Sequence, residues 1–332
     1  MREFQLYGLG NALVDIFVEL SDEEFAALAF ERGSMRLVEP AEQKTLLERF
    51  EKREPRLVSG GSVANSIIAF AQLGGQAAFL GCVGDDRYGL FYKTEFDELG
   101  VEIGNPIVVG QTTGTCVCLI TPDAERTMRT CLGVSSHLSA QYVDERRLKE
   151  AEWLFVEGYV LANPQTGQGA VREALRLARR HGVRVALTCS EAFVVSQFHG
   201  AFFETLDQTD LLFCNAAEAC AVTGKANAEK AFAALAGRVS SALVTDGPNG
   251  AYVRHGGVEA HVPAFACQPV DLTGAGDMLA GAFLYGISHG VSADRAARAA
   301  CYLAMKVITQ VGARLHHGTR RFWEECLSEL AA

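Results

Sequence analysis

The hydrophobic pattern switches between two periods along most of the chain. Short runs that are apolar throughout have the length of strands, at residues 4–9, 77–83, 153–156, 183–188, 211–214 and 241–245. Longer stretches place apolar residues on one helical face, at residues 40–50, 64–73, 164–180 and 292–310. Strands that are apolar on both faces are typical of a parallel sheet covered by helices on both sides. The sequence therefore predicts a doubly wound, mainly parallel α/β fold.

Residues 107–131 break this rhythm. They contain two alternating runs, TGTCVCLIT and ERTMRTC, joined through Pro122 and Asp123, which predicts a β-hairpin. With the predicted strands at 13–20 and 33–39, the hairpin can form a small separate sheet. We expect a large α/β domain of residues 1–11, 40–106 and 134–332, and a small β lid of residues 12–39 and 107–133.

Composition excludes several classes of protein. The formal net charge of −10 argues against a broad basic surface for nucleic acid. No apolar run reaches the length of a membrane span, and the N-terminus MREFQLYGLG lacks a signal-peptide pattern, so we expect a cytoplasmic protein without a membrane partner. The ten cysteines form no CxxC pair, which favours buried thiols over disulfides or a zinc site.

The stretch 271–286, DLTGAGDMLAGAFLYG, carries the sharpest chemical signal. Its glycine turn, Gly274, Ala275 and Gly276, opens an apolar run with the density of a buried helix. Backbone N–H groups at such a helix start can bind phosphate oxygens, and Asp277 beside them could accept the proton of an alcohol. No Gly-Lys-Ser/Thr follows, so this is not a Walker A loop. The alternative is that Asp277 only complements the helix dipole and the glycines only allow close packing.

Two further stretches carry polar residues at positions suited to binding hydroxyls. Asn11 and Asp15 stand four apart at the start of a predicted strand, and could reach one ligand from one face. Gly60 and Gly61 permit close backbone approach before a helix that contains Asn65. The alternative roles are a turn-capping Asn and a solvated Asp at the first stretch, and a glycine hinge before a capped helix at the second.

Two strand ends offer groups for phosphate and metal. Asn215 and Glu218 begin a helix in the spacing of a capping box, so a purely structural role is a strong alternative. Thr245, Gly247 and Gly250 lie in the loop TDGPNG, which can contact phosphates through its backbone or simply be a turn.

The motifs GNALVDI, GGSVAN, VGDDRYG, NAAE, TDGPNG and TGAGD occur in an order that resembles the ribokinase-like (PfkB) family of sugar and nucleoside kinases. The resemblance implies that ATP and Mg²⁺ are used to phosphorylate a primary hydroxyl, and that residues 292–310, expected as the final helix, pack beside the adenine. It also implies the following roles: Asp277 as base with the anion hole of residues 274–276; Asn11, Asp15, Gly60, Gly61 and Asn65 on the acceptor; Asn215 and Glu218 around magnesium; and Thr245, Gly247 and Gly250 on ATP.

By the same resemblance Arg126, in the predicted lid, lies near the transferred phosphate; its alternative is a surface charge on an exposed strand. Leu272 departs from the family signature, where a small or hydroxylated residue is usual, and leaves the need for a monovalent cation open.

The acceptor is expected to be a nucleoside, adenosine first. A nucleoside needs a flat apolar slot for its base, and Tyr159 and Phe193 offer rings next to strand ends. The segment SEAFVVSQF and the N-terminal GNALVDI resemble the adenosine-kinase branch, although core packing is the alternative role of the rings. Inosine, guanosine and a ribokinase- or fructokinase-like specificity stay open, as does the choice between monomer and homodimer.

Two classes of protein outside the kinases are alternatives. A dinucleotide-dependent oxidoreductase is disfavoured, because Leu13 stands where the third glycine after Gly8 and Gly10 is needed. A non-catalytic sensor of this fold would bind nucleotide without turnover, and the intact Asp277 argues against it.

Overall fold

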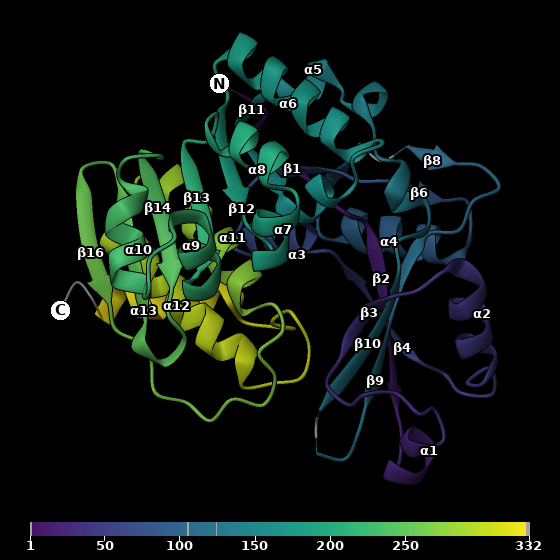
Figure 1. The fold of residues 1–332 in the computed structure, drawn as a ribbon. Helices are drawn as coiled ribbons and strands as arrows, with labels where there is room; N and C mark the ends of the chain where they lie inside the picture. The colour runs from purple at the N-terminus through teal and green to yellow at the C-terminus, as the bar shows by residue number, and fades with distance from the viewer. Residues whose placement is uncertain (1, 105, 124, 330–332) are drawn as a thin grey trace.

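A nine-stranded sheet forms the centre of the larger part of the molecule (Figure 1). The computed structural model describes residues 2–104, 106–123 and 125–329. Across the sheet the strands run β16 (Val258–Val262), β15 (Ala251–His255), β14 (Ser241–Thr245), β13 (Leu211–Asn215), β12 (Arg184–Thr188), β11 (Ala151–Glu157), β1 (Phe4–Leu9), β5 (Ala77–Leu80) and β7 (Glu102–Ile103). Pairing is parallel from β14 to β7, and antiparallel where β15 and β16 are added. The expected doubly wound, mainly parallel fold is confirmed.

Helices cover both faces of this sheet, and each face has its own hydrophobic core. One core includes residues of α3 (Ser62–Gln72), α4 (Arg87–Glu98), α11 (Ala275–Ser288), α12 (Ala293–Ile308) and α13 (Thr319–Glu329). The other includes residues of α5 (Glu145–Leu148), α6 (Gly167–His181), α7 (Ala192–Gln197), α8 (His199–Leu206), α9 (Ala216–Thr223) and α10 (Ala228–Leu235). Because the sheet is buried on both sides, its central strands are apolar throughout.

Some helices depart from the sequence predictions. The helix expected at residues 292–310 is present as α12, but it is not the last one, since α13 follows and packs against it. Helices α7 and α8 were not predicted, because neither is long enough to show a full apolar stripe. None of the helices in the described ranges is long and apolar enough to cross a membrane. All ten cysteines are free thiols.

The second sheet has five strands, in the order β3 (Met35–Leu37), β10 (Arg126–Cys131), β9 (Gly114–Ile120), β2 (Leu13–Glu19) and β4 (Arg56–Gly60), and is called the small sheet below. Figure 1 shows it extending away from the large sheet, with α2 (Pro40–Glu48) beside it. The predicted hairpin is confirmed, since β9 and β10 pair antiparallel. Placing residues 56–60 in the large domain was wrong, because β4 pairs with β2. A separate strand pair, β6 (Val83–Gly84) and β8 (Ile107–Val108), follows β5, so the run 77–83 is not one strand.

The two faces of the small sheet differ in chemistry. Val14, Ile16 and Val117 point to one face. Together with Leu46 of α2 they join the hydrophobic core that also contains residues of α3, α4, α11, α12 and α13. The register of β2 and β9 puts Asp15 opposite Cys116, and Phe17 opposite Cys118, on the other face. Since successive side chains alternate between faces, this second face carries Asp15 and the thiols of Cys116 and Cys118.

Candidate active site

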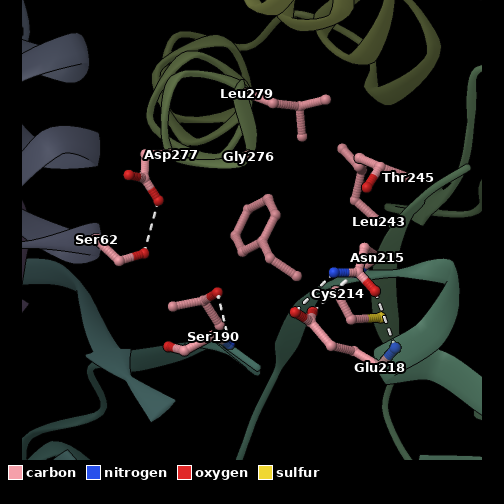
Figure 2. A pocket seen from close by; sticks show the side chains of 12 residues that line it. Ser62, Ser190, Cys214, Asn215, Glu218, Leu243, Thr245, Gly276, Asp277 and Leu279 are labelled. Atoms are coloured by element: carbon pink, nitrogen blue, oxygen red, sulfur yellow. Dashed lines mark hydrogen bonds between the residues drawn. The ribbon is translucent and has the colours of Figure 1, made fainter. Parts of the chain in front are cut away.

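Asp277 lies in the first turn of α11 and is held by two side chains of α3. Ser62 Oγ donates to Asp277 Oδ1 at 2.6 Å, and Asn65 Nδ2 donates to Asp277 Oδ2 at 2.9 Å. Figure 2 shows Asp277 and Ser62 facing each other at one side of a cavity. Asp277 therefore does more than complement the helix dipole, because its carboxylate accepts hydrogen bonds from side chains of α3, a helix far from α11 in the sequence.

Burial raises the pKa of Asp277 to about 6, against the opposing effect of the hydrogen bonds from Ser62 and Asn65. A carboxyl with a pKa near the working pH is well matched to taking a proton from an alcohol and releasing it afterwards. The position and the pKa of Asp277 both suit a general base.

The glycine turn before α11 has two glycines with different reasons to be there. Gly274 has φ 76°, and a Cβ at this position would lie 2.3 Å from the Ala313 carbonyl oxygen, so both conformation and space require glycine. A Cβ on Gly276 would meet nothing within 4 Å, and Gly276 lines the cavity. Among the described residues, the N–H groups of Gly276 and Asp277 have no acceptor. These N–H groups can donate hydrogen bonds to an anion at the positive end of α11.

The cavity has a volume of about 180 Å³ and lies at the carboxyl ends of β12, β13 and β14, where ligands bind in open parallel sheets. Its walls bring together residues predicted from three separate motifs: Asp277, the pair Asn215 and Glu218, and Thr245. The remaining lining residues are Ser62, Thr188, Ser190, Phe213, Cys214, Leu243, Gly276 and Leu279.

Asn215 and Glu218 form a capping box, the alternative that the sequence offers to a role at magnesium. Asn215 Oδ1 accepts from Glu218 N at 2.9 Å, and Glu218 Oε2 accepts from Asn215 N at 2.9 Å. Asn215 Nδ2 also donates to Glu218 Oε1 at 2.8 Å. Burial raises the pKa of Glu218 to about 7. The pair therefore stabilises the start of α9 and also faces the cavity, so the two roles are compatible.

The loop at 245–250 contributes one lining residue, Thr245. Gly250 has φ 99°, and a Cβ there would lie 2.0 Å from the Val262 carbonyl oxygen, so the turn into β15 requires glycine. Gly247, at φ 53°, has open space around its Cα. Neither glycine lines the cavity, and contact of this loop with a nucleotide stays a prediction.

Asp15 lies across from α11 on the small sheet. A Cβ on Gly60 would lie 2.8 Å from Asp15 Oδ2, and Gly61 follows with φ 111°. Burial raises the pKa of Asp15 to about 6, and Arg314 and Arg126 oppose this effect. The glycines at the end of β4 thus leave room for this carboxyl and for any hydroxyl that approaches it.

Asp15, Cys116 and Cys118 are the group of potential metal ligands found among the described residues, with ligand atoms within 4.8 Å of one another. Mg²⁺ takes oxygen ligands, so two thiols and one carboxyl do not suit it. The carboxylate and amide oxygens of Glu218 and Asn215, on the cavity wall, are the better match for magnesium and its waters.

Asn11 is positioned differently from the prediction. The expected strand face shared by Asn11 and Asp15 is wrong, because β2 begins only at Leu13. Asn11 Nδ2 instead donates to Glu157 Oε1 at 2.8 Å, while Glu157 Oε2 accepts from Val63 N at 3.1 Å. Glu157 is 1% exposed, and burial raises its pKa to about 7. The sequence patterns do not single out Glu157, although a carboxyl at the end of an apolar strand is a usable signal.

Arg126 is a buried partner of the segment before the glycine turn. Its Nη2 forms an ion pair with Asp271 Oδ2 at 2.5 Å, and its Nη1 donates to Thr273 Oγ1 at 3.1 Å. The Arg126 side chain is 9% exposed and its guanidinium lies 5.1 Å from the centre of the Phe17 ring. The alternative of an exposed surface charge is therefore wrong, and Arg126 ties the small sheet to the start of α11.

Tyr159 and Phe193 come together, with ring centres 6.1 Å apart and planes at 39°. Both rings are half-buried against the core of α6 to α10. Neither lines the cavity, but Tyr159 N donates to the Oγ of Ser190, which does. The rings therefore lie near the cavity and also pack, so a role in stacking on a base stays a prediction.

A part-buried carboxyl beside N–H groups without an acceptor among the described residues, at the ends of parallel strands, is the arrangement that transfer of a phosphoryl group to a hydroxyl requires. The chain belongs to the PfkB family of carbohydrate kinases, since the profile described as "pfkB family carbohydrate kinase" matches residues 33–318. Kinases of this family use ATP and act on sugars or nucleosides.

The relatives divide between these two classes of acceptor. The chain is 28% identical to a ribokinase from Haemophilus influenzae over 275 residues, covering 80% of this chain and 86% of the relative. It is similar to the structure of an adenosine kinase from Sinorhizobium meliloti, with 30% identity, 99% and 100% coverage of the two chains and a TM-score of 0.87. It is also similar to a probable sugar kinase from Rhizobium etli, with 29% identity, 98% and 99% coverage and a TM-score of 0.88.

Proposed function

We propose that the protein transfers the γ-phosphoryl group of ATP to the 5′-hydroxyl of a nucleoside, with adenosine as the first candidate. The observation that carries the proposal is the position of Asp277. Its carboxyl is held by Ser62 and Asn65, adjoins the N–H groups at the start of α11, and shares a cavity with Asn215, Glu218 and Thr245.

In this proposal Asp277 accepts the proton of the acceptor hydroxyl, and the N–H groups of Gly276 and Asp277 bind the phosphoryl oxygens as negative charge shifts onto them. Bound Mg²⁺ neutralises charge on the nucleotide phosphates. Asn215 and Glu218 would hold the waters of that ion from the opposite wall, as their oxygens and their place in the cavity allow. Because Leu272 departs from the family signature, dependence on a monovalent cation is tested by the arms of the assay with and without K⁺.

The acceptor hydroxyls would be held by Asp15, Asn65 and Glu157, with Asn11 fixed by its bond to Glu157. The open backbone at Gly60 and Gly61 admits the sugar ring, and Arg126 keeps the small sheet against the glycine turn through Asp271.

A nucleoside is favoured over a free sugar by the apolar groups beside Asp15. Phe17, Cys116 and Cys118 form a separate apolar cluster on this face of the small sheet, joined by Val58, Ile120 and Met128. Such a wall suits a flat base, whereas a free sugar has hydroxyls around its whole ring and needs polar partners on every side. The similarity to an adenosine kinase supports the same choice. The similarity to a ribokinase keeps a sugar kinase as the second candidate.

The test is an ADP-release assay with ATP and Mg²⁺ over adenosine, inosine, guanosine, ribose and fructose, each with and without K⁺. We expect the highest kcat/KM with adenosine. Efficient phosphorylation of ribose or fructose, with none of any nucleoside, would overturn the nucleoside assignment and leave a sugar kinase.

A further inference from the structure

Arg314, in the segment after α12, is a buried arginine that reaches the acceptor side of the site. Its Nε donates to Asn65 Oδ1 at 3.0 Å, its Nη1 to Glu95 Oε1 at 3.1 Å, and its Nη2 to Ser59 Oγ at 3.0 Å. Arg314 is only 7% exposed. A guanidinium this deeply buried is costly unless its charge and its donors are paired, as they are here.

The first of these bonds decides how Asn65 is oriented. A carboxamide has one acceptor end and one donor end, and Arg314, which has donors only, must face the acceptor. With Asn65 Oδ1 turned toward Arg314, Asn65 Nδ2 points to Asp277 Oδ2 at 2.9 Å. Without Arg314 the amide could turn over, and its oxygen would then face the carboxylate and repel it.

Arg314 also supplies positive charge to a site rich in acids. The titratable groups that interact with Asp277 are Arg314, Asp15 from β2, Glu157 from β11 and Tyr159 from the turn after β11. Arg314 lowers the pKa of both Asp277 and Asp15. The second nearby cation, Arg126, is paired with Asp271. Arg314 is paired with Glu95, and it is the cation whose charge lowers the pKa of Asp277.

The residues before Arg314 support the same part of the site. Gly312 N donates to Asp271 Oδ2 at 2.7 Å, and Ala313 packs against Gly274, where a Cβ would lie 2.3 Å from its carbonyl oxygen. Three successive residues therefore contact the partner of Arg126, the glycine turn and the Asn65 amide. This arrangement fixes Arg314 relative to the helix start that carries Asp277.

We propose that Arg314 is a positioning residue for the phosphoryl transfer: through Asn65 and through its charge it keeps the Asp277 carboxyl oriented and ionised toward the acceptor hydroxyl. The proposal rests on the proposed function, in which Asp277 is the base. Glu95 and Ser59 hold the other end of the guanidinium, so both its direction and its charge are set before an acceptor binds.

The test compares Arg314→Gln and Arg314→Lys with Arg129→Gln as the matched control. Arg129 is an equally buried arginine, 4% exposed, whose bonds are to Ser34 and the Met128 carbonyl in the small sheet. Two quantities are measured: the pH profile of kcat/KM, and the pKa of the Asp277 carboxyl in the ligand-free protein by ¹³C NMR, with its signal assigned through Asp277→Asn.

We expect Arg314→Gln to lower kcat roughly 10- to 100-fold, the size of a lost orientation. It should move the acid limb of the pH profile and the NMR titration of Asp277 to higher pH, because removal of a cation favours the protonated acid. Arg314→Lys should restore the position of the acid limb but not the full kcat. Lys keeps the positive charge but lacks the planar guanidinium whose separate N–H groups reach Asn65, Glu95 and Ser59. Arg129→Gln should leave both quantities at the parent values.

An unchanged Asp277 titration and acid limb in folded Arg314→Gln would overturn the inference and leave the proposed function standing. The double variant Arg314→Gln with Asp277→Asn should be no slower than Asp277→Asn alone, and a further loss would show that Arg314 acts elsewhere. If Asp277→Asn keeps the parent turnover, the base assignment fails, while the NMR titration still reports whether Arg314 controls this carboxyl.

Discussion

Two walls of the cavity are held in different ways. The proposed nucleotide wall, with Asn215, Glu218 and Thr245 at the ends of β13 and β14, is held by contacts within a few residues. The proposed acceptor wall, with Ser62 and Asp277, is held by contacts across the whole chain. Asn215 and Glu218 cap each other three residues apart, and Asp246 N donates to the Gly250 carbonyl. On the other wall Asp277 contacts Ser62 at a separation of 215 residues, and Arg314 contacts Asn65 at a separation of 249.

The two walls therefore depend on folding in different ways. Contacts within one turn form together with the helix or loop that contains them. Long-range contacts exist only once the fold has closed, and each partner is positioned by a different element. We therefore expect substitutions on the acceptor wall to act on turnover through geometry, and those on the nucleotide wall to act mainly on the metal requirement.

The largest effect is expected for Asp277→Asn. An Asn at this position can keep both contacts, accepting from Asn65 and donating to Ser62 Oγ, so the fold and ATP binding should be retained. Turnover should fall roughly 10²- to 10⁴-fold, the size of a general-base contribution. Steady-state kinetics and ATP titration measure the two quantities. Turnover within a factor of two of the parent would remove Asp277 from the base role.

The glycine turn offers a second test, because its glycines differ. Gly276→Val has room for its side chain but fills the space next to the N–H groups, and should cost about 3 kcal/mol of transition-state stabilisation, roughly 10²-fold in rate. Its thermal stability should stay near that of the parent. Gly274→Val should instead destabilise the fold, owing to its positive φ and the Ala313 contact. If Gly276→Val turns over ATP normally, the anion site lies elsewhere.

Phe193→Ala tests whether the base of a nucleoside stacks on the Tyr159 and Phe193 rings as well as lying against the cluster of Phe17, Cys116 and Cys118. Loss of an aromatic platform is worth roughly 1–3 kcal/mol, so the KM for adenosine should rise about 5- to 150-fold. Any residual activity on ribose should be affected far less, because ribose has no base. Equal changes in KM for adenosine and for ribose would show that Phe193 only packs against Tyr159 and does not stack on a base.

Four buried or part-buried carboxyls should make the ligand-free protein less stable as pH rises. Burial raises the pKa of Asp15 and Asp277 to about 6, and that of Glu157 and Glu218 to about 7. Between pH 4 and 7 the folded state binds more protons than the unfolded state, so the free energy of unfolding falls with increasing pH.

Urea denaturation at pH 5 and pH 8 measures this dependence. Asp277→Asn should remove about 1 kcal/mol of the difference between the two pH values, as the share of one carboxyl. A parent protein that is more stable at pH 8 than at pH 5 would contradict the raised pKa values.

The sequence predicted what depends on neighbouring residues. The apolar strands, the hairpin of β9 and β10 and the capping box of Asn215 and Glu218 all follow from local patterns. The glycine turn at Gly274 was also recognisable, since a positive φ needs glycine.

What the sequence did not predict depends on tertiary pairing. Strand β4 alternates too weakly to be recognised, and becomes a strand because β2 pairs with it. Glu157 gains its contacts to Asn11 and Val63 only when β11 and α3 meet. Arg314, one charged residue in a segment without periodicity, has no local signal for its contact with Asn65.

The smallest effect is expected for Glu218→Gln on the nucleotide wall. Gln can still accept from the Asn215 backbone with its oxygen, so α9 should begin at the same residue. The change removes the charge that would attract magnesium and its waters, and the Mg²⁺ concentration for half-maximal rate should rise several-fold, as expected for losing part of the electrostatic hold on the ion. Thr223→Ala, at the far end of α9 and outside the cavity, is the matched control. A magnesium titration of Glu218→Gln that overlays the parent curve would leave Glu218 with its capping role alone. The nucleotide wall would then act through backbone and helix position rather than through this carboxylate.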